Sequence, residues 1–176
     1  MDPQIDQCRD LTDQDKEQLA SVETGLFLTA DITRADLLLF SLLDSERAVV
    51  ARHAAPASAA SLYREEQTGT VVSGAERPLV LRVLQGGRGG RQEREAKGSR
   101  APVIQDVHPV YNADNLVIGA LAMEFNMFSY ERHRGRSRVF QDAARTLLRM
   151  CARGDLVCTT DLTRFGLYDG IYLVDR

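Results

Sequence analysis

Two pairs of apolar, strand-like segments constrain the fold of this chain more than any other feature. The first pair is ADLLLFSLL (35–43) and AVVARHAAP (48–56), and the second is PVIQDVHPVY (102–111) and LVIGALAMEF (116–125). The turn-forming sequences DSER and NADN join the members of each pair, so each pair predicts a β-hairpin. Two hairpins of this kind can form one antiparallel sheet.

Three further segments have helical patterns. Segments 12–33 and 137–154 each place apolar residues along one stripe, and a shorter segment begins near Pro78 and ends at Gly86 and Gly87. The resulting order is helix, hairpin, helix, hairpin, helix. This order predicts an α+β fold with an antiparallel sheet flanked by N- and C-terminal helices, the architecture of GAF-like and PAS-like domains.

Composition excludes several classes of protein. A chain of 176 residues with 44% hydrophobic content suits one domain with a core of its own, and a net charge of −3 argues against a nucleic-acid partner. The longest apolar runs are far shorter than a membrane helix requires, and the N-terminus MDPQIDQCRD lacks the basic start of a signal peptide. We therefore expect a cytoplasmic protein with no membrane association.

Cysteine chemistry and metal binding are weakly indicated. The three cysteines Cys8, Cys151 and Cys158 contain no CxxC pair, so they predict neither a disulfide framework nor a metal site. Cys151 falls on the apolar stripe of the last helix, as a small core residue would. No motif of a hydrolase, a zinc protease or a kinase occurs in the sequence.

Two basic segments are candidates for anion binding. The segment GGRGGRQEREAKGSR (86–100) fits neither the P-loop nor the dinucleotide-binding fingerprint, and we expect it to be a mobile loop. The segment YERHRGRSR (130–138) precedes the last helix. Arginines at a helix N-terminus are electrostatically unfavourable, which leaves two readings: a solvated linker, or a surface for an anion or an acidic partner.

Strand alternation suggests a position for a small-molecule site. We expect it between the sheet and region 60–100, bordered by five polar residues: Arg52, Tyr63, Asp106, His108 and Tyr111. Asp106 and His108 alternate on one strand face, but no third metal ligand accompanies them. The expected ligand is an unidentified small molecule, with no metal or cofactor.

The whole pattern resembles a known family. The runs LTADITRADLLLFSLLD, VVARHAAP, HPVY…NLVIGALAME and RSRVFQDAARTLLRMCARG are similar to the N-terminal GAF-like sensor domain of cytoplasmic two-component histidine kinases of the actinobacterial PdtaS type. The resemblance covers roughly residues 15–160. In that family a PAS domain follows, and YDGIYLVDR resembles its opening strand.

The resemblance implies a domain organisation and a function. It implies a flexible N-terminus (1–12), a GAF-like sensor domain (13–156), and a linker with the first strand of a PAS domain (157–176). The sensor domain would control autophosphorylation and phosphotransfer by kinase domains absent from this chain, which would also bind the ATP. The parent would phosphorylate a response regulator, and the segment itself would not be an enzyme.

We expect a homodimer formed through the first and last helices. Each helix can bury one face against the sheet of its own chain and another face against a second copy related by two-fold symmetry. The stripe residues predicted for this role are Leu19, Val22, Leu26, Val139, Leu147 and Leu148. Two alternatives remain open. The domain could serve only for dimerisation or protein interaction without a ligand, or it could be a thiol-dependent GAF-type methionine sulfoxide reductase.

Overall fold

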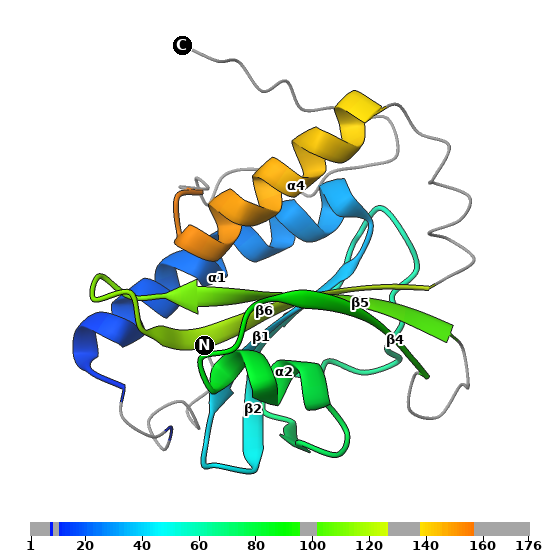
Figure 1. Cartoon of the computed structure of the whole chain (residues 1–176). Coiled ribbons are helices and arrows are strands. Elements are labelled where there is room, and N and C mark those ends of the chain that lie inside the picture. Colours follow the sequence, from blue (N-terminus) through cyan, green and yellow to red (C-terminus); the bar gives the residue numbers. More distant parts are fainter. Residues whose placement is uncertain (1–7, 9–10, 96–101, 127–137, 157–176) are drawn as a thin grey trace.

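A computed structural model describes residues 8, 11–95, 102–126 and 138–156, with the side chains of residues 95 and 138–141 left aside. Six strands form one antiparallel sheet in the order β3-β2-β1-β6-β5-β4. Helices α1 and α4 cover one face of this sheet, and α2 covers the other (Figure 1). The predicted α+β architecture with flanking N- and C-terminal helices is therefore confirmed.

The two hairpins form the centre of the sheet. The first consists of β1 (Asp36–Leu42) and β2 (Arg47–Ala54), and the second of β5 (Pro102–Tyr111) and β6 (Val117–Asn126). β1 and β6 pair directly, with Asp36 opposite Glu124 and Phe40 opposite Ala120. Nearly every residue of these two central strands is buried, because helices or loops cover both of their faces.

The first helix, α1 (Asp13–Thr33), begins at a capping box. The Thr12 side chain accepts the backbone N–H of Asp15, and the Asp15 carboxylate accepts the backbone N–H of Thr12. α1 approaches the sheet closely at Gly119, where an added Cβ would lie 2.8 Å from Leu19 Cδ2. A side chain at position 119 would therefore require the Leu19 side chain to move.

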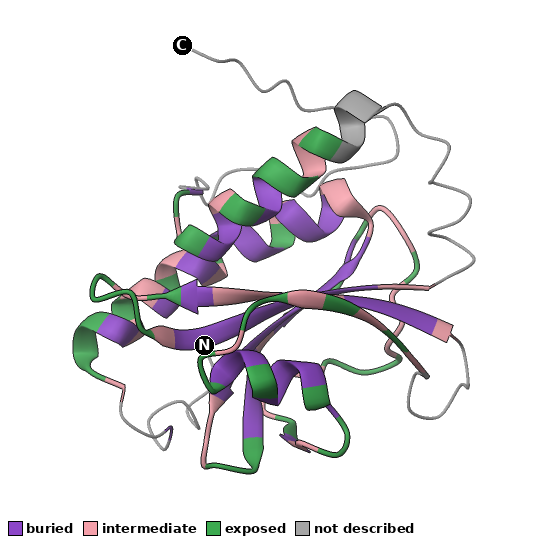
Figure 2. Ribbon diagram, in the orientation of Figure 1, coloured by how far each residue is buried: buried purple, intermediate pink, exposed green. Residues whose placement is uncertain are grey.

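The last helix, α4 (Arg138–Arg153), packs beside α1. Its Leu147, Leu148 and Cys151 join the apolar cluster between the two helices and the sheet, and its outward residues are exposed (Figure 2). Two hydrogen bonds tie its end to α1: Gln18 Nε2 donates to the carbonyl of Arg153 at 2.7 Å, and Thr24 Oγ1 donates to that of Leu156 at 3.0 Å.

The other face of the sheet carries a second apolar cluster. The short helix α2 (Pro78–Leu84) contributes Leu79, Val80 and Val83, which pack against Phe40 and Val107. The strand β3 (Val71–Ser73) forms one edge of the sheet beside β2. Between β2 and β3 the chain runs as a loop, and its residues 61–68 lie over the same face as α2.

The expectation of a mobile loop over 86–100 is wrong for its first part. The strand β4 (Gly90–Glu95) pairs with β5 along its whole length, from Gly90 opposite Val107 to Glu95 opposite Pro102. The sequence GRQERE has few apolar residues, so it shows neither the alternation of apolar and polar residues nor the hydrophobicity that would predict a strand. As an edge strand, β4 needs only one hydrogen-bonded neighbour, and charged side chains are usual there.

Several predictions fall outside the described residues. They concern most of the flexible N-terminus 1–12, residues 96–100 of the glycine-rich segment, the basic segment up to residue 137, and the PAS opening at 157–176. Cys158 lies there as well. No helix in the described parts of the chain is both long and apolar enough to span a membrane.

Candidate functional site

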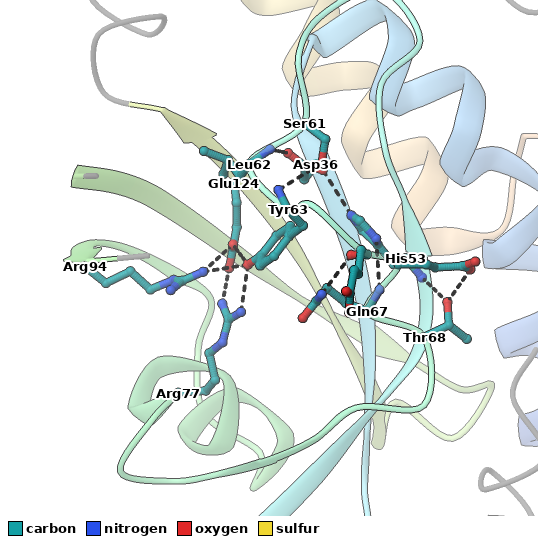
Figure 3. A network of polar contacts seen from close by, with 12 residues as sticks. Asp36, His53, Ser61, Leu62, Tyr63, Gln67, Thr68, Arg77, Arg94 and Glu124 are labelled. Atoms are coloured by element: carbon teal, nitrogen blue, oxygen red, sulfur yellow. Dashed lines mark hydrogen bonds and ion pairs between the residues drawn. The ribbon is translucent and has the colours of Figure 1, made fainter. Parts of the chain in front are cut away.

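A buried carboxylate on β6 is the centre of a polar network within the described residues. Glu124 has no exposed surface, yet four side chains donate hydrogen bonds to it. Figure 3 shows three of them, Tyr63, Arg77 and Arg94. Gln105 Nε2 donates to Oε1 at 2.6 Å, and Arg94 Nη2 donates to Oε2 at 2.5 Å. Arg77 Nη1 donates to Oε1 and the Tyr63 hydroxyl donates to Oε2. The carboxylate is thus fully satisfied without water.

The donors come from four different parts of the chain. Tyr63 belongs to the loop after β2, Arg77 is the residue before α2, Arg94 lies on β4, and Gln105 lies on β5. Tyr63 is central among them, because its hydroxyl also accepts from Arg77 Nη2 at 2.8 Å and from Arg94 Nη2 at 2.7 Å. The network therefore holds loop, helix and edge strand together over the sheet.

Electrostatics in the network favour the ionised carboxylate. Burial alone would raise the pKa of Glu124, but the charges of Arg77 and Arg94 outweigh it and hold that pKa below its usual value. Burial and the neighbouring Glu124 charge raise the pKa of Tyr63 to about 12, so its hydroxyl keeps its proton at neutral pH. For Arg77, burial lowers the pKa, but the Glu124 carboxylate reverses this effect and raises it.

A second buried carboxylate lies beside the first. Asp36 is the cross-strand partner of Glu124, and its carboxylate accepts Ser61 Oγ at 2.6 Å, the Leu62 N–H at 2.8 Å and His53 Nε2 at 3.0 Å. The backbone N–H of Gln67 donates to His53 Nδ1 at 3.2 Å. That nitrogen must therefore carry a lone pair, which places the imidazole proton on Nε2, toward Asp36.

The two carboxylates together hold loop 61–68 against the sheet. Asp36 binds its start, His53 binds its end, and Glu124 binds Tyr63 between them, where the tyrosine ring meets the His53 ring edge-on with centroids 5.3 Å apart. The guanidinium groups of Arg77 and Arg94 are both paired with the Glu124 carboxylate.

Only Tyr63, of the five residues predicted to border a ligand, belongs to this network. Arg52 lies on the opposite face, where its guanidinium is 3.4 Å from Glu23 Oε1 and stacks over Phe27 at 5.3 Å. The structure brings Asp106 and His108 together, with 3.3 Å between Oδ1 and Nε2, but on the face that α4 covers. Tyr111 lies at the end of β5 and is exposed.

The expectation that these five residues border one site is therefore corrected. Alternation within a strand shows which residues share a face, but it does not show which face of one hairpin continues which face of the other. A register shift between Leu39 and Phe40 adds to the difficulty, because it changes the alternation of β2 relative to β1.

Sequence reasoning missed Asp36, His53, Arg77, Arg94 and Glu124 as members of the site. A signal was available for the two carboxylates, since each is an acidic residue within a strongly apolar strand, in ADLLLFSLL and in LVIGALAMEF. Acidic residues are almost never fully buried unless they are paired. The two apolar strands thus predict partners for both residues, although they do not identify them.

The helix residues predicted to form a dimer interface contribute to the core of this chain. Leu19, Val22 and Leu26 have no exposed surface, and Leu147 and Leu148 are buried against them. The side chain of Val139 lies outside the described residues. An interface on these helices would have to use outward residues such as Ala20 and Phe27, and Phe27 is 41% exposed.

Within the described residues, the cysteines lie away from the polar network. Cys8 and Cys151 are both buried in the cluster beneath α1, with Cys151 Sγ 3.8 Å from the carbonyl oxygen of Val22. Burial in apolar surroundings suppresses thiolate formation, which gives no support to a thiol-dependent enzyme at these two positions.

The fold and the site together define a class of protein. A six-stranded antiparallel sheet between helices, with a polar site beneath a loop on one face, is the arrangement of a GAF-type sensor domain. The chain belongs to the family of PdtaS histidine kinase GAF domains, whose family model matches residues 3–144.

Solved structures agree with this fold. The sensor region of a sensor histidine kinase matches with a TM-score of 0.62 and 21% identity, over 90% of this chain and 53% of that one. The chain thus spans about half the length of that structure. The C-terminal domain of a putative transcriptional regulator from Vibrio cholerae matches with a TM-score of 0.53 and 13% identity, over 81% of this chain and 98% of that one.

An IclR transcriptional regulator from Alicyclobacillus acidocaldarius matches with a TM-score of 0.51 and 14% identity, over 85% of this chain and 69% of that chain. No protein with a curated description matches this chain. The structural likenesses concern the fold, and the sensor role comes from the family.

Proposed function

We propose that this chain is the signal-input domain of a two-component histidine kinase, and that its buried polar network is the element that responds to the signal. In this proposal the domain controls autophosphorylation and phosphotransfer to a response regulator by kinase domains outside this chain. Membership of the PdtaS GAF family supports the role of a sensor.

The observation that carries the proposal is the burial of Glu124 among two arginines and a tyrosine. Buried ion pairs rarely stabilise a fold more than apolar residues of the same volume would, because both charges must lose their hydration. The loss of one partner, however, leaves a buried charge unpaired, so a signal that displaces a partner would strongly destabilise this arrangement. A network of this kind is therefore suited to a switch.

The network is also placed where a ligand could alter it. Loop 61–68 and Arg77 cover it from the side of α2, and neither belongs to a strand of the sheet (Figure 3). A small molecule entering beneath the loop would compete for the same hydrogen bonds. Its effect on the equilibrium would be set by its difference in affinity for the closed and open loop.

In this proposal the sheet carries the change from the network to the last helix. Glu124 binds Gln105 of β5, and β5 is also the strand on which α4 packs. The end of α4 is in turn bonded to α1 through Arg153 and Leu156. A shift of β5 would consequently change the position of α4 on the sheet. The chain continues from α4 toward residue 157.

We also propose that the parent works as a homodimer and lies in the cytoplasm, with PAS and kinase domains following in the same chain. A domain used only for interaction would be expected to have a wholly apolar interior. The α2 face instead contains a buried carboxylate that is paired with two arginines, which favours the sensor over that alternative.

The experiment that tests this proposal is an autophosphorylation assay on the full-length parent protein. Tyr63→Phe removes only the hydroxyl group of the network, and Arg77→Gln removes one of its charges. The matched control is Arg82→Gln, because Arg82 is an exposed arginine one turn along α2. We expect both network variants to change the rate at least about twofold and the control to leave it unchanged. Folded network variants with the unaltered rate would refute the proposal.

A further inference from the structure

A cavity of about 500 Å³ lies on the face of the sheet opposite the buried network. It opens where the turn between β5 and β6 meets the first part of α1 and the last part of α4. Its lining includes Arg149 and Arg153 from α4, Gln18 from α1, and His108, Tyr111 and Asn115 from the hairpin. A volume of this size is in the usual range for small-molecule sites.

The cavity lining is rich in hydrogen-bond donors and contains no carboxylate. Arg149 and Arg153 are four residues apart on α4, so their side chains emerge on the same side of the helix. Two acids lie directly behind the lining. Asp15 accepts from the lining residue Asn112 at 2.9 Å and caps α1, and Asp106 accepts from Arg91 at 2.7 Å and lies 3.3 Å from Nε2 of the lining residue His108.

The cavity also offers surface to a flat ring. Tyr111 is 43% exposed at its rim, and Pro109 lies in the wall beside it. Exposed tyrosines of this kind supply a large, rigid contact area at a small cost in conformational entropy.

We propose that this cavity binds a small organic anion, an aromatic or similarly flat molecule that carries a carboxylate or a phosphate group. Arg149 and Arg153 would hold the anionic group, because a guanidinium presents paired N–H donors that match both kinds of oxyanion. Gln18 and Asn115 supply neutral donors or acceptors, and Tyr111 contacts the ring. This site is separate from the Glu124 network and does not depend on it.

A ligand bound in the cavity would fix the position of α4 relative to α1 and β5. The lining joins α4 to both α1 and β5, and the existing bond from Gln18 to the carbonyl of Arg153 already spans part of the gap. A bound anion would add contacts from the α4 arginines to the same neighbours. The site therefore offers a second input to the helix that leads out of the domain.

The proposal is tested by titrating the 176-residue chain with three probes that share a benzene ring: phenyl phosphate, benzoate and the neutral benzamide. Amide NMR signals of residues 108–115 report binding in the cavity. We expect at least one anion to shift these signals saturably and benzamide to leave them unchanged. Saturation by phenyl phosphate alone would assign the phosphate class, and saturation by benzoate alone the carboxylate class.

Variants of α4 locate the binding. Arg149→Gln and Arg153→Gln should each raise the Kd of the anion that binds by about tenfold or more, because each removes a charged hydrogen-bond donor. Arg145→Gln is the matched control, an exposed arginine on the same helix that does not line the cavity. All three side chains are exposed, so the variants are expected to fold.

Three results would each overturn the proposal. The first is that neither anion shifts the signals saturably. The second is that benzamide binds as tightly as the anions, because the arginines would then contribute nothing. The third is that Arg145→Gln weakens binding as much as the two cavity variants, since the effect would then come from net charge alone.

Discussion

Asp36 and Glu124 lie directly opposite each other on β1 and β6, and both carboxylates are buried on the α2 face of the sheet. Two ionised carboxylates side by side in a core would repel strongly if nothing else were present. Each has its own set of donors, however: backbone and His53 for one, two arginines for the other. The pair thus anchors loop 61–68 at two points on neighbouring strands.

Glu124→Gln should destabilise the domain by roughly 3–5 kcal/mol, because it leaves the guanidinium groups of Arg77 and Arg94 buried without their counter-charge. Urea denaturation at neutral pH measures this difference. The control is Glu93→Gln on β4, an exposed residue whose replacement should change the unfolding free energy by less than about 0.5 kcal/mol. A cost for Glu124→Gln no larger than that of the control would contradict the charge network.

Acid should remove the contribution of Glu124 within a defined range of pH. Its pKa in the folded protein lies below the usual 4.5, so the folded state binds this proton less readily than the unfolded state does. The stabilisation is present above pH 4.5 and is lost as the pH falls below that value through the folded pKa. Unfolding free energies measured from neutral pH down to about pH 3 should fall less steeply in Glu124→Gln than in the wild type. An equal dependence of unfolding free energy on pH in the two proteins would contradict the lowered pKa of Glu124.

Asp36→Asn should loosen loop 61–68 without unfolding the sheet. The Leu62 amide loses its charged acceptor, and His53, which holds the Gln67 amide, loses the group that orients its ring. Hydrogen exchange of these two amides should accelerate about tenfold or more, since a hydrogen bond to a charged group contributes roughly 1.5–3 kcal/mol. Asp44→Asn in the exposed β1–β2 turn is the control. Unchanged exchange at Leu62 would show that Asp36 does not hold the loop.

Gly154→Ala should lower the free energy of unfolding more than Gly86→Ala does. Both glycines have a positive φ, 74° at Gly154 and 88° at Gly86. An alanine in this conformation costs roughly 1–2 kcal/mol at either position. At 154 the new Cβ would also come within 2.9 Å of Ser21 Cβ on α1, whereas at 86 nothing lies within 4 Å. Thermal unfolding should therefore show an extra loss of about 1 kcal/mol or more for Gly154→Ala. Equal losses would indicate that the end of α4 is not tightly packed on α1.

The elements that the sequence predicts well are those with a strong period. Segment 12–33 is predicted as a helix with Thr12 or Asp13 as its N-cap. α1 starts at Asp13 with Thr12 as the N-cap, because the side chains of Thr12 and Asp15 each accept the other residue's backbone N–H. Both hairpins are predicted within two residues of their observed bounds, because their apolar runs are sharply ended by DSER and NADN. β4 is missed, because an edge strand needs no buried face.

The buried site is harder to predict than the fold because its members are far apart in the chain. Arg77 and Arg94 are 47 and 30 residues from Glu124, and no local pattern connects them. Their meeting depends on the strand order, in which β6 lies two strands from the edge strand β4. Tyr63 is predicted to border a ligand site, without a partner for its hydroxyl. The pairing that gives it a role becomes visible only once β1, β5 and β6 are assembled.

Coupling between the buried network and the last helix is tested most directly by hydrogen exchange of Tyr63→Phe in the intact chain. The substitution removes one hydroxyl group on the α2 face, whereas α4 lies on the other face. If Glu124, Gln105 and β5 connect the two, amides of residues 147–152 in α4 should exchange at least about twofold faster than in the wild type. Faster exchange confined to loop 61–68, with α4 unchanged, would contradict the proposed route from sensor site to output helix.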